Sequence, residues 1–234
     1  FPVLNAIFEG IYGENPYKSP TDMGVNMAGK CIVDDEVCCE ASKMEIIRRY
    51  YTTLGKLANE EAAEGEVYKI ELLMKQAKIS TDERKVTVAA KERAAKLGVP
   101  TAAIELPDGH IITSKTTDLL GASAALLLNA LKFLGNVDHD THLIPASAIE
   151  PIQQLKVKYL GGKNPRLHTD EILIALTLSA LTDENAKAAI EQLPKLRGCQ
   201  AHTSVMLSEV DLKIFKRLGV ELTSEPIKKQ RRLF

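Results

Sequence analysis

The chain has 234 residues, of which 45% are hydrophobic and 26% are charged. This composition is that of a folded globular protein and excludes a mostly disordered one. Thirty Lys and Arg residues nearly balance 31 Asp and Glu residues, so the chain has no overall field that would attract nucleic acid or an anionic membrane. We therefore predict neither a nucleic-acid partner nor a membrane partner.

The apolar runs and the cysteines bear on location. Polar residues interrupt the longest apolar runs, which are shorter than the roughly 20 residues that span a bilayer, and the sequence shows no signal peptide. The four cysteines have the spacing of neither a disulfide framework nor a zinc site; they are Cys31, Cys38, Cys39 and Cys199. A cytoplasmic protein is expected.

Residues 1–37 contain the highest density of turn-forming residues in the chain, with recurring glycines and prolines. A loop of this length is typical of a segment that binds something or packs against a neighbouring domain. The run from Phe1 to Phe8 resembles the interior of a protein sequence rather than its beginning. We expect residues 1–37 to be an interdomain loop region that completes a missing N-terminal half, with a cleaved pro-segment as the alternative.

Residues 38–98 contain no proline and predict a helical subdomain. Apolar residues recur at helical spacing from Ile46 to Leu54 and again from Val67 to Ala77. Ser80, followed by acidic residues, caps a third helix that is expected to end near Gly98.

Residues 99–234 predict an α/β subdomain. Two short strands, 102–106 and 111–113, flank the tight turn Pro107–Gly109. The elements expected next are a helix over 119–134, a strand over 142–145, helices over 146–160, 169–181 and 183–193, a strand over 203–207, a helix over 208–218 and a strand over 220–223. This order predicts a three-layer α/β/α sandwich around a mixed sheet.

Several strings of the chain resemble one protein family. They run from Ser19 to Met27, Ala41 to Tyr50, Asn164 to Glu171 and Gly198 to His202. On these strings the chain resembles the bacterial domain of unknown function 1846 family, and in particular its C-terminal half, because a glycine-rich stretch of the N-terminal half is absent. The resemblance implies the missing N-terminal half as a partner and a sandwich with cytidine-deaminase-like topology. It implies no established reaction.

The implied deaminase-like topology raises the question of whether the chain has the zinc ligands of deaminases. Zinc deaminases place their ligands and a catalytic Glu at the starts of the two helices that follow the hairpin. The corresponding runs here, Leu120 to Ala124 and Pro145 to Glu150, supply no zinc ligand. His139 and His142 are another candidate pair, but residues three apart in a strand point to opposite faces, so a solvated loop is favoured. We predict no metal site.

Two junctions before helices predict anion binding. Arg166 and His168 precede a helix whose free N–H groups favour an anion. The alternative is that Thr169 caps this helix and Arg166 pairs with a carboxylate. Lys115 and Ser123 flank the entry to the helix after the hairpin, where backbone N–H groups and a point charge can hold an anion, and capping alone is the alternative.

Two further pairs carry candidate chemistry. Asp22 and Asn26 are candidates for catalysis or substrate positioning, and the alternative is that they hydrogen-bond their own loop. Cys199 and His202 suggest a thiol nucleophile, but a buried structural cysteine is favoured because no activating base is evident.

These observations predict an uncharacterised bacterial protein with one leading hypothesis and two alternatives. The hypothesis is part of an enzyme that acts on a small phosphorylated or nucleotide-like substrate, with the candidate residues named above around its site. The alternatives are a non-catalytic ligand-sensing or regulatory domain and an oligomerisation scaffold, so homo-oligomers stay open. The sequence identifies no cofactor.

Overall fold

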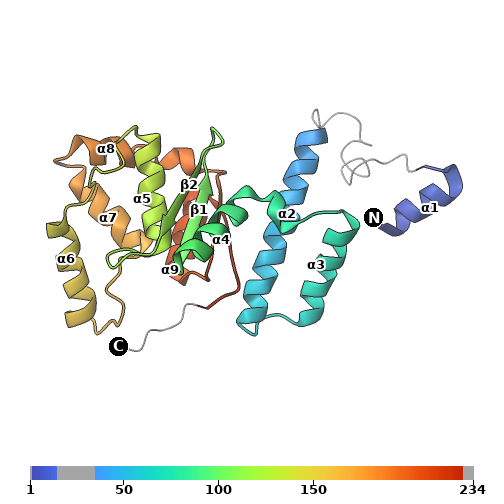
Figure 1. Ribbon diagram of the computed structural model, residues 1–234, viewed down its shortest axis with the longest axis horizontal. Coiled ribbons are helices and arrows are strands. Elements are labelled where there is room, and N and C mark those ends of the chain that lie inside the picture. Colours follow the sequence, from blue (N-terminus) through green and yellow to red (C-terminus); the bar gives the residue numbers. More distant parts are fainter. Residues whose placement is uncertain (1, 15–34, 229–234) are drawn as a thin grey trace.

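The computed structural model of the chain describes residues 2–14 and 35–228 (Figure 1). The predicted site residues Asp22 and Asn26 lie outside this part of the chain. The first described elements are helices, which are α1 (Pro2–Tyr12), α2 (Asp35–Ala58), α3 (Glu64–Gln76), the short 3₁₀ turn η1 (Thr81–Glu83) and α4 (Lys85–Leu97). A helix, α1, therefore stands at the beginning of the region expected to be a loop.

A four-stranded mixed sheet forms the centre of the rest of the chain. Its strands are β1 (Thr101–Glu105), β2 (Ile111–Lys115), β3 (Gln200–Thr203) and β4 (Glu221–Ser224), in the spatial order β2-β1-β3-β4. The β1–β2 hairpin turns at Gly109, whose φ of 84° is a conformation that glycine adopts without strain. Because β1 is antiparallel to both neighbours and β3 is parallel to β4, the carboxyl ends of β2, β3 and β4 lie at one edge.

The strand predicted over residues 142–145 is wrong. These residues form a loop with bends directly before a helix, although Leu143 and Ile144 are buried in the core. A short apolar run is compatible with any buried segment, and periodicity alone cannot identify it as a strand. Here the run is buried by loop packing and forms no ladder.

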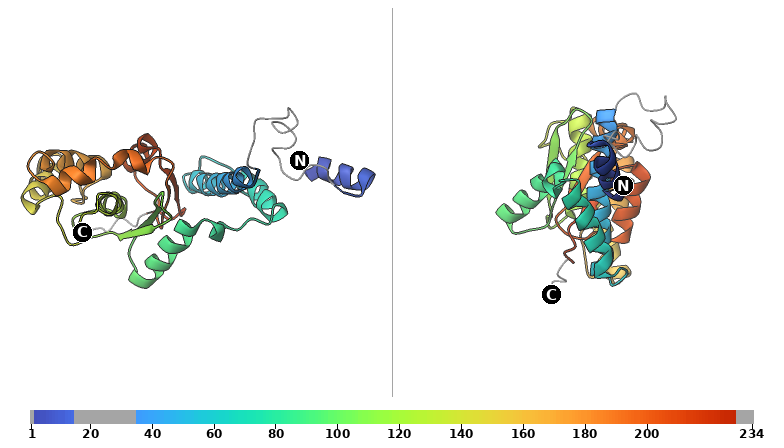
Figure 2. Two further views of the ribbon diagram at one scale, coloured as in Figure 1. Left: turned by 90° about the horizontal axis from the view of Figure 1, so that it is seen from above. Right: turned by 90° about the vertical axis from the view of Figure 1, so that its right-hand side faces the viewer.

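Helices cover both faces of the sheet, as predicted (Figure 2). Ala102, Ile104 and Ala201 belong to the large core formed with α5 (Ala122–Leu134), α7 (Thr169–Ser179) and α9 (Glu209–Leu218). Alternation along the strands turns Ala103 and His202 to the other face, where Ala103 packs against α4. The mixed α/β fold class and its three layers are confirmed.

The remaining helical elements of the described chain are α6 (Ala146–Gln154), the π-helical turn η2 (Leu155–Tyr159), α8 (Glu184–Ile190) and the 3₁₀ turn η3 (Leu193–Leu196).

Helices α2 and α3 pack against each other around a small core of their own. Helix α2 also contacts β4, where Arg48 pairs with Glu221. Helix α4, although assigned to the helical subdomain by sequence, packs on the sheet. The proposed units 1–37, 38–98 and 99–234 stay a prediction.

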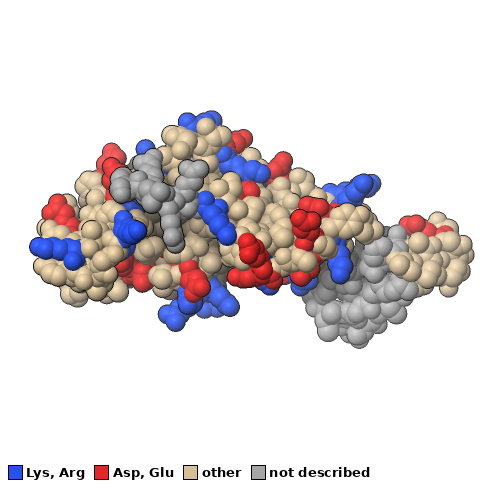
Figure 3. All heavy atoms as spheres, turned by 90° about the horizontal axis from the view of Figure 1, so that it is seen from below, with Lys and Arg blue, Asp and Glu red and all other residues tan. Residues whose placement is uncertain are grey.

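Two surface properties complete the description. Positive and negative side chains are interspersed over the face shown in Figure 3, which presents no continuous basic surface. None of the helices in residues 2–14 and 35–228 is long and apolar enough to cross a membrane.

Candidate functional site

The starts of three helices meet at the carboxyl edge of the sheet. Strand β2 leads into α5 and β3 leads into α9, so both helices begin at the edge where ligands bind in open α/β sheets. The segment before α7 joins them, because the Leu167 N–H donates to the Leu119 carbonyl at 2.9 Å and Leu167 forms a bridge with Leu120. The sequence thus brings three helix N-termini together from distant segments.

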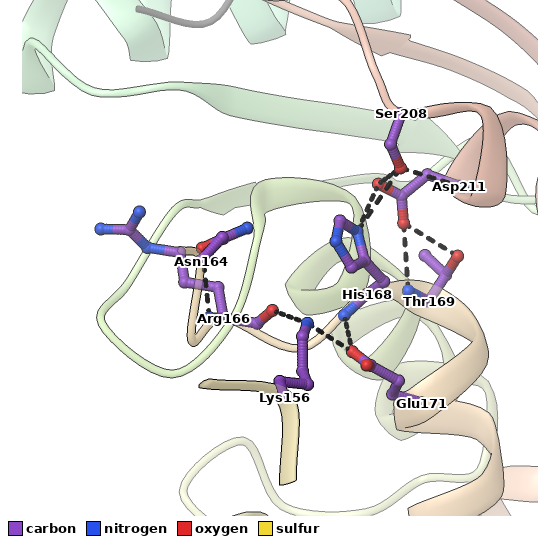
Figure 4. A network of polar contacts seen from close by, with 8 residues as sticks. All are labelled: Lys156, Asn164, Arg166, His168, Thr169, Glu171, Ser208 and Asp211. Carbon is purple, nitrogen blue, oxygen red and sulfur yellow. Dashed lines mark hydrogen bonds and ion pairs between the residues drawn. The ribbon is translucent and has the colours of Figure 1, made fainter. Parts of the chain in front are cut away.

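His168 and Asp211 connect two of these helix starts (Figure 4). The His168 Nδ1 atom lies 3.3 Å from the Asp211 Oδ2 atom. The second carboxylate oxygen accepts hydrogen bonds from the Thr169 N–H and the Thr169 hydroxyl, both at 3.0 Å. Ser208, the cap of α9, donates to Oδ2 at 2.9 Å. Asp211 is 1% exposed, so it is a buried carboxylate held by four donors.

The electrostatics of this carboxylate fix the tautomer of His168. Burial alone would raise the pKa of Asp211, but the hydrogen bonds from His168, Thr169 and Ser208 lower that pKa to about 2. An ionised Asp211 is an acceptor, so the proton of a neutral His168 lies on Nδ1. The Nε2 atom then carries the lone pair, on the side of the ring that faces away from Asp211 in Figure 4.

Ser208 does not complete a serine-protease triad. Its hydroxyl lies 3.4 Å from Nδ1, the same ring nitrogen that faces Asp211. In a triad the serine contacts Nε2 and the aspartate contacts Nδ1. The arrangement therefore provides an oriented histidine that can take or give a proton, without a serine nucleophile.

The first turn of α7 is already bound by side chains of the protein. Glu171 accepts from the His168 N–H at 2.7 Å, and Lys156 Nζ lies 2.8 Å from the same carboxylate oxygen of Glu171. Lys156 also donates to the Arg166 carbonyl at 2.5 Å. An anion at the start of α7 would have to compete with both Glu171 and Asp211.

The other three predicted anion contacts, Arg166, Ser123 and Lys115, lie near the start of α5 or at the end of β2. Arg166 Nε donates to the Thr117 carbonyl at 2.6 Å, and its guanidinium points away from His168 in Figure 4. This contact places Arg166 against the loop that enters α5. Ser123 is 1% exposed in the first turn of α5, whereas Lys115 is exposed at the end of β2.

Two of the weaker sequence candidates show no reactive geometry. Cys199 is 5% exposed, burial raises the pKa of its thiol, and its Sγ contacts the Lys195 carbonyl. His202 instead faces Thr223 and Glu225. In the described ranges, no group of three His, Cys, Asp or Glu residues is placed to hold a metal ion.

A hollow of ≈ 700 Å³ lies away from this edge, between α2 and the amino ends of β3 and β4. Arg84 lines it, is 1% exposed, and donates to the carbonyls of Ala201 and Glu221. Burial lowers the pKa of Arg84 to about 10, and the charge of Arg48 adds to this effect. Since four glutamates share the lining with two arginines, the hollow has no single charge preference.

The comparisons with known proteins identify relatives without a described activity. The chain is 53% identical over 226 residues to a UPF0371 protein of Corynebacterium urealyticum, covering 97% of this chain and 46% of that protein. It is 49% identical over 234 residues to a UPF0371 protein of Streptococcus pyogenes, covering 100% of this chain and 47% of that protein. The chain therefore spans about half the length of the curated relatives it matches.

Two family domains match consecutive parts of the chain. The domain described as "Domain of unknown function DUF1846, N-terminal" matches residues 1–78, and its C-terminal counterpart matches residues 82–234. The prediction that the chain is only the C-terminal half of the family, with a missing N-terminal half of the same protein as its partner, is wrong, because residues 1–78 themselves match the N-terminal domain. The absence of a glycine-rich stretch was a misleading criterion, since residues 1–78 match the N-terminal domain without it. The chain belongs to the DUF1846 family, also named UPF0371, whose function is not characterised.

Proposed function

We propose that the protein is an enzyme that acts on a small phosphorylated or nucleotide-like substrate by proton transfer through His168. The observation that carries this proposal is the pairing of His168 Nδ1 with the buried, ionised Asp211 at 3.3 Å. A cytoplasmic location and homo-oligomers stay predictions beside it.

The chemistry follows from the two nitrogen atoms of the ring. With its proton on Nδ1, His168 accepts a proton at Nε2 from a hydroxyl group or a water molecule. The imidazolium that results is stabilised by the Asp211 carboxylate, which also keeps the ring oriented. The deprotonated oxygen forms a bond to the phosphorus atom of the substrate, the bond from phosphorus to the leaving oxygen breaks, and the protonated ring gives its proton to that leaving oxygen. The His168 side chain is 29% exposed, so a substrate can reach it.

The test is turnover by the full-length protein. A panel of sugar phosphates and nucleoside monophosphates is incubated with the protein and followed by ³¹P NMR spectroscopy. We expect His168→Gln to lower the turnover of the accepted substrate by roughly 10² to 10⁴-fold, the usual range for a general acid or base. Glutamine keeps the size and hydrogen bonding of the side chain but cannot titrate.

His110→Gln is the matched control. His110 Nδ1 also lies 3.1 Å from a carboxylate oxygen, that of Asp108, but this pair sits on the open β1–β2 turn with the histidine side chain 64% exposed. Its replacement should leave turnover unchanged. The proposal fails if the wild-type protein converts no member of the panel, or if His168→Gln turns over as fast as the wild type.

A further inference from the structure

The first turn of α5 is buried and has no cap. Ala122, Ser123 and Ala124 are 2%, 1% and 0% exposed, respectively. The N–H groups of a helix's first residues have no partner within the helix, and here the cap position is Gly121, which has no side chain to accept from them. Within residues 35–228, no acceptor for these three N–H groups is found. Buried backbone donors without partners are rare in folded proteins.

Two hydroxyl groups at this helix start also form no hydrogen bond with the described residues. Ser123 forms no side-chain hydrogen bond with the described residues, although it is 1% exposed. Thr116 Oγ1 is buried without a partner. Thr116 continues the geometry of β2, because its N–H donates to the Pro100 carbonyl at 2.8 Å. It therefore faces the same side as Ser114, whose hydroxyl donates to the Ala122 carbonyl at 2.7 Å.

There is room beside Gly121, the residue that precedes these donors. A Cβ atom built on Gly121 would meet only Ser123 Oγ, at 3.8 Å, within a radius of 4 Å. The backbone of Gly121 has φ −68° and ψ 158°, which any residue can adopt. Gly121 is thus not required for backbone conformation, and its missing side chain leaves space beside the helix start.

We infer that the start of α5 binds the phosphoryl group of the substrate. Its unpaired N–H groups and the Ser123 hydroxyl supply donors, and the helix dipole adds a partial positive charge. Arg166, anchored on the Thr117 carbonyl, holds a full positive charge against the loop that enters α5. Lys115 is not part of this site, because strand alternation turns it to the opposite face from Ser114 and Thr116.

This inference deepens the proposed function. The catalytic role of the phosphoryl site rests on the proposed proton transfer through His168. The Gly121 N–H lies 3.5 Å from the carbonyl of Leu167, the residue before His168. The phosphoryl site and the proton-transfer site therefore adjoin. A substrate held by its phosphoryl group at α5 would present a neighbouring group to His168.

The experiment measures binding of inorganic phosphate to the full-length protein by isothermal titration calorimetry, at constant ionic strength maintained with chloride. We expect saturable binding by the wild type. Ser123→Ala should weaken it about tenfold, the effect of losing one hydrogen bond to a charged group. Gly121→Ala should weaken it more, because its methyl group fills the space beside Ser123 Oγ without backbone strain.

Gly55→Ala is the matched control, since Gly55 lies in α2 with nothing within 4 Å of an added Cβ. It should bind phosphate like the wild type. The inference is overturned if the wild type binds no phosphate, or if Gly121→Ala and Ser123→Ala bind it unchanged. Thermal unfolding of each variant establishes that it is folded.

His168→Gln separates this inference from the proposed function. It should bind phosphate with unchanged affinity while losing turnover. If turnover depends on His168 but phosphate binding does not depend on Gly121 and Ser123, only the phosphoryl site is refuted. If phosphate binding depends on them but no turnover depends on His168, only the catalytic proposal is refuted.

Discussion

Two histidine–carboxylate pairs in this protein have the same length but different surroundings. His168 Nδ1 lies 3.3 Å from Asp211, and His202 Nε2 lies 3.3 Å from Glu225. The His168 side chain is 29% exposed, whereas that of His202 is 0% exposed. His202 lies under Tyr51 of α2, with the two ring centroids 4.9 Å apart.

The second nitrogen of each ring shows what the difference means. His202 Nδ1 is 2.8 Å from the Thr223 hydroxyl, so both ring nitrogens of His202 face groups of the protein. Burial lowers the pKa of His202, and the neighbouring His202 ring lowers the pKa of Glu225. His202 therefore joins β3, β4 and α2, whereas the side chains that contact the His168 ring do so at Nδ1, which leaves its Nε2 atom without a partner among the described residues. Exposure distinguishes a site from a structural joint, even where the pair itself is similar.

We expect the largest effect on stability at the pair of His202 and Glu225, which we call the closed pair because the histidine side chain is 0% exposed. The pair of His168 and Asp211 is the open pair. His202→Ala opens a cavity and removes a partner from both Thr223 and Glu225, so we expect a loss of about 3 kcal/mol of unfolding free energy. His168→Ala should cost about 1.5 kcal/mol, since its ring is partly exposed and the substitution removes one hydrogen bond to a charged carboxylate. Urea unfolding of both variants measures the difference. Equal losses would contradict the distinction between joint and site.

The sequence predicts the parts of this fold that have local signals. Pro107–Gly109 indicated the hairpin that β1 and β2 form, and the αL glycine Gly98 ends α4 as expected. The run 142–145 was misassigned because an apolar segment buried as a loop has the same pattern as a buried strand. Residues 15–34, which include Asp22 and Asn26, lie outside the described structure, so their predicted roles remain predictions.

Only part of the candidate site could be predicted from the sequence, because only part of it has a local signal. His168 stood out because it precedes a helix. Asp211 lies 43 residues further along, in the first turn of α9, where an acidic residue is also explained by the positive end of the helix. A hydrogen bond between two helix starts has no local pattern, so no spacing rule would find it. The unpaired donors of α5 are equally invisible, because Ser123 alone indicates neither burial nor a missing partner.

The acid sensitivity of the open pair gives an intermediate effect. The pKa of Asp211 is about 2 in the folded protein, below the usual value of about 3.9. Such a lowered pKa stabilises the fold fully above about pH 4, and this contribution is lost as the pH falls toward 2. It amounts to roughly 2 to 3 kcal/mol. Asp211→Asn should lack this component, which urea unfolding between pH 5 and pH 2 measures. An equally steep loss in the variant would contradict the assignment.

The smallest effect concerns the contact of α2 with the closed pair. The Tyr51 hydroxyl donates to Glu225 at 3.3 Å, and burial raises the pKa of Tyr51. Tyr51→Phe removes this bond but retains the ring over His202, so we expect a loss of about 1 kcal/mol of unfolding free energy. Tyr50→Phe is the matched control, because its hydroxyl makes an exposed bond of 3.4 Å to Glu71 and should contribute less than about 0.5 kcal/mol. If both variants unfold alike, the packing of the Tyr51 ring, and not its hydroxyl, holds α2 to the sheet at this pair.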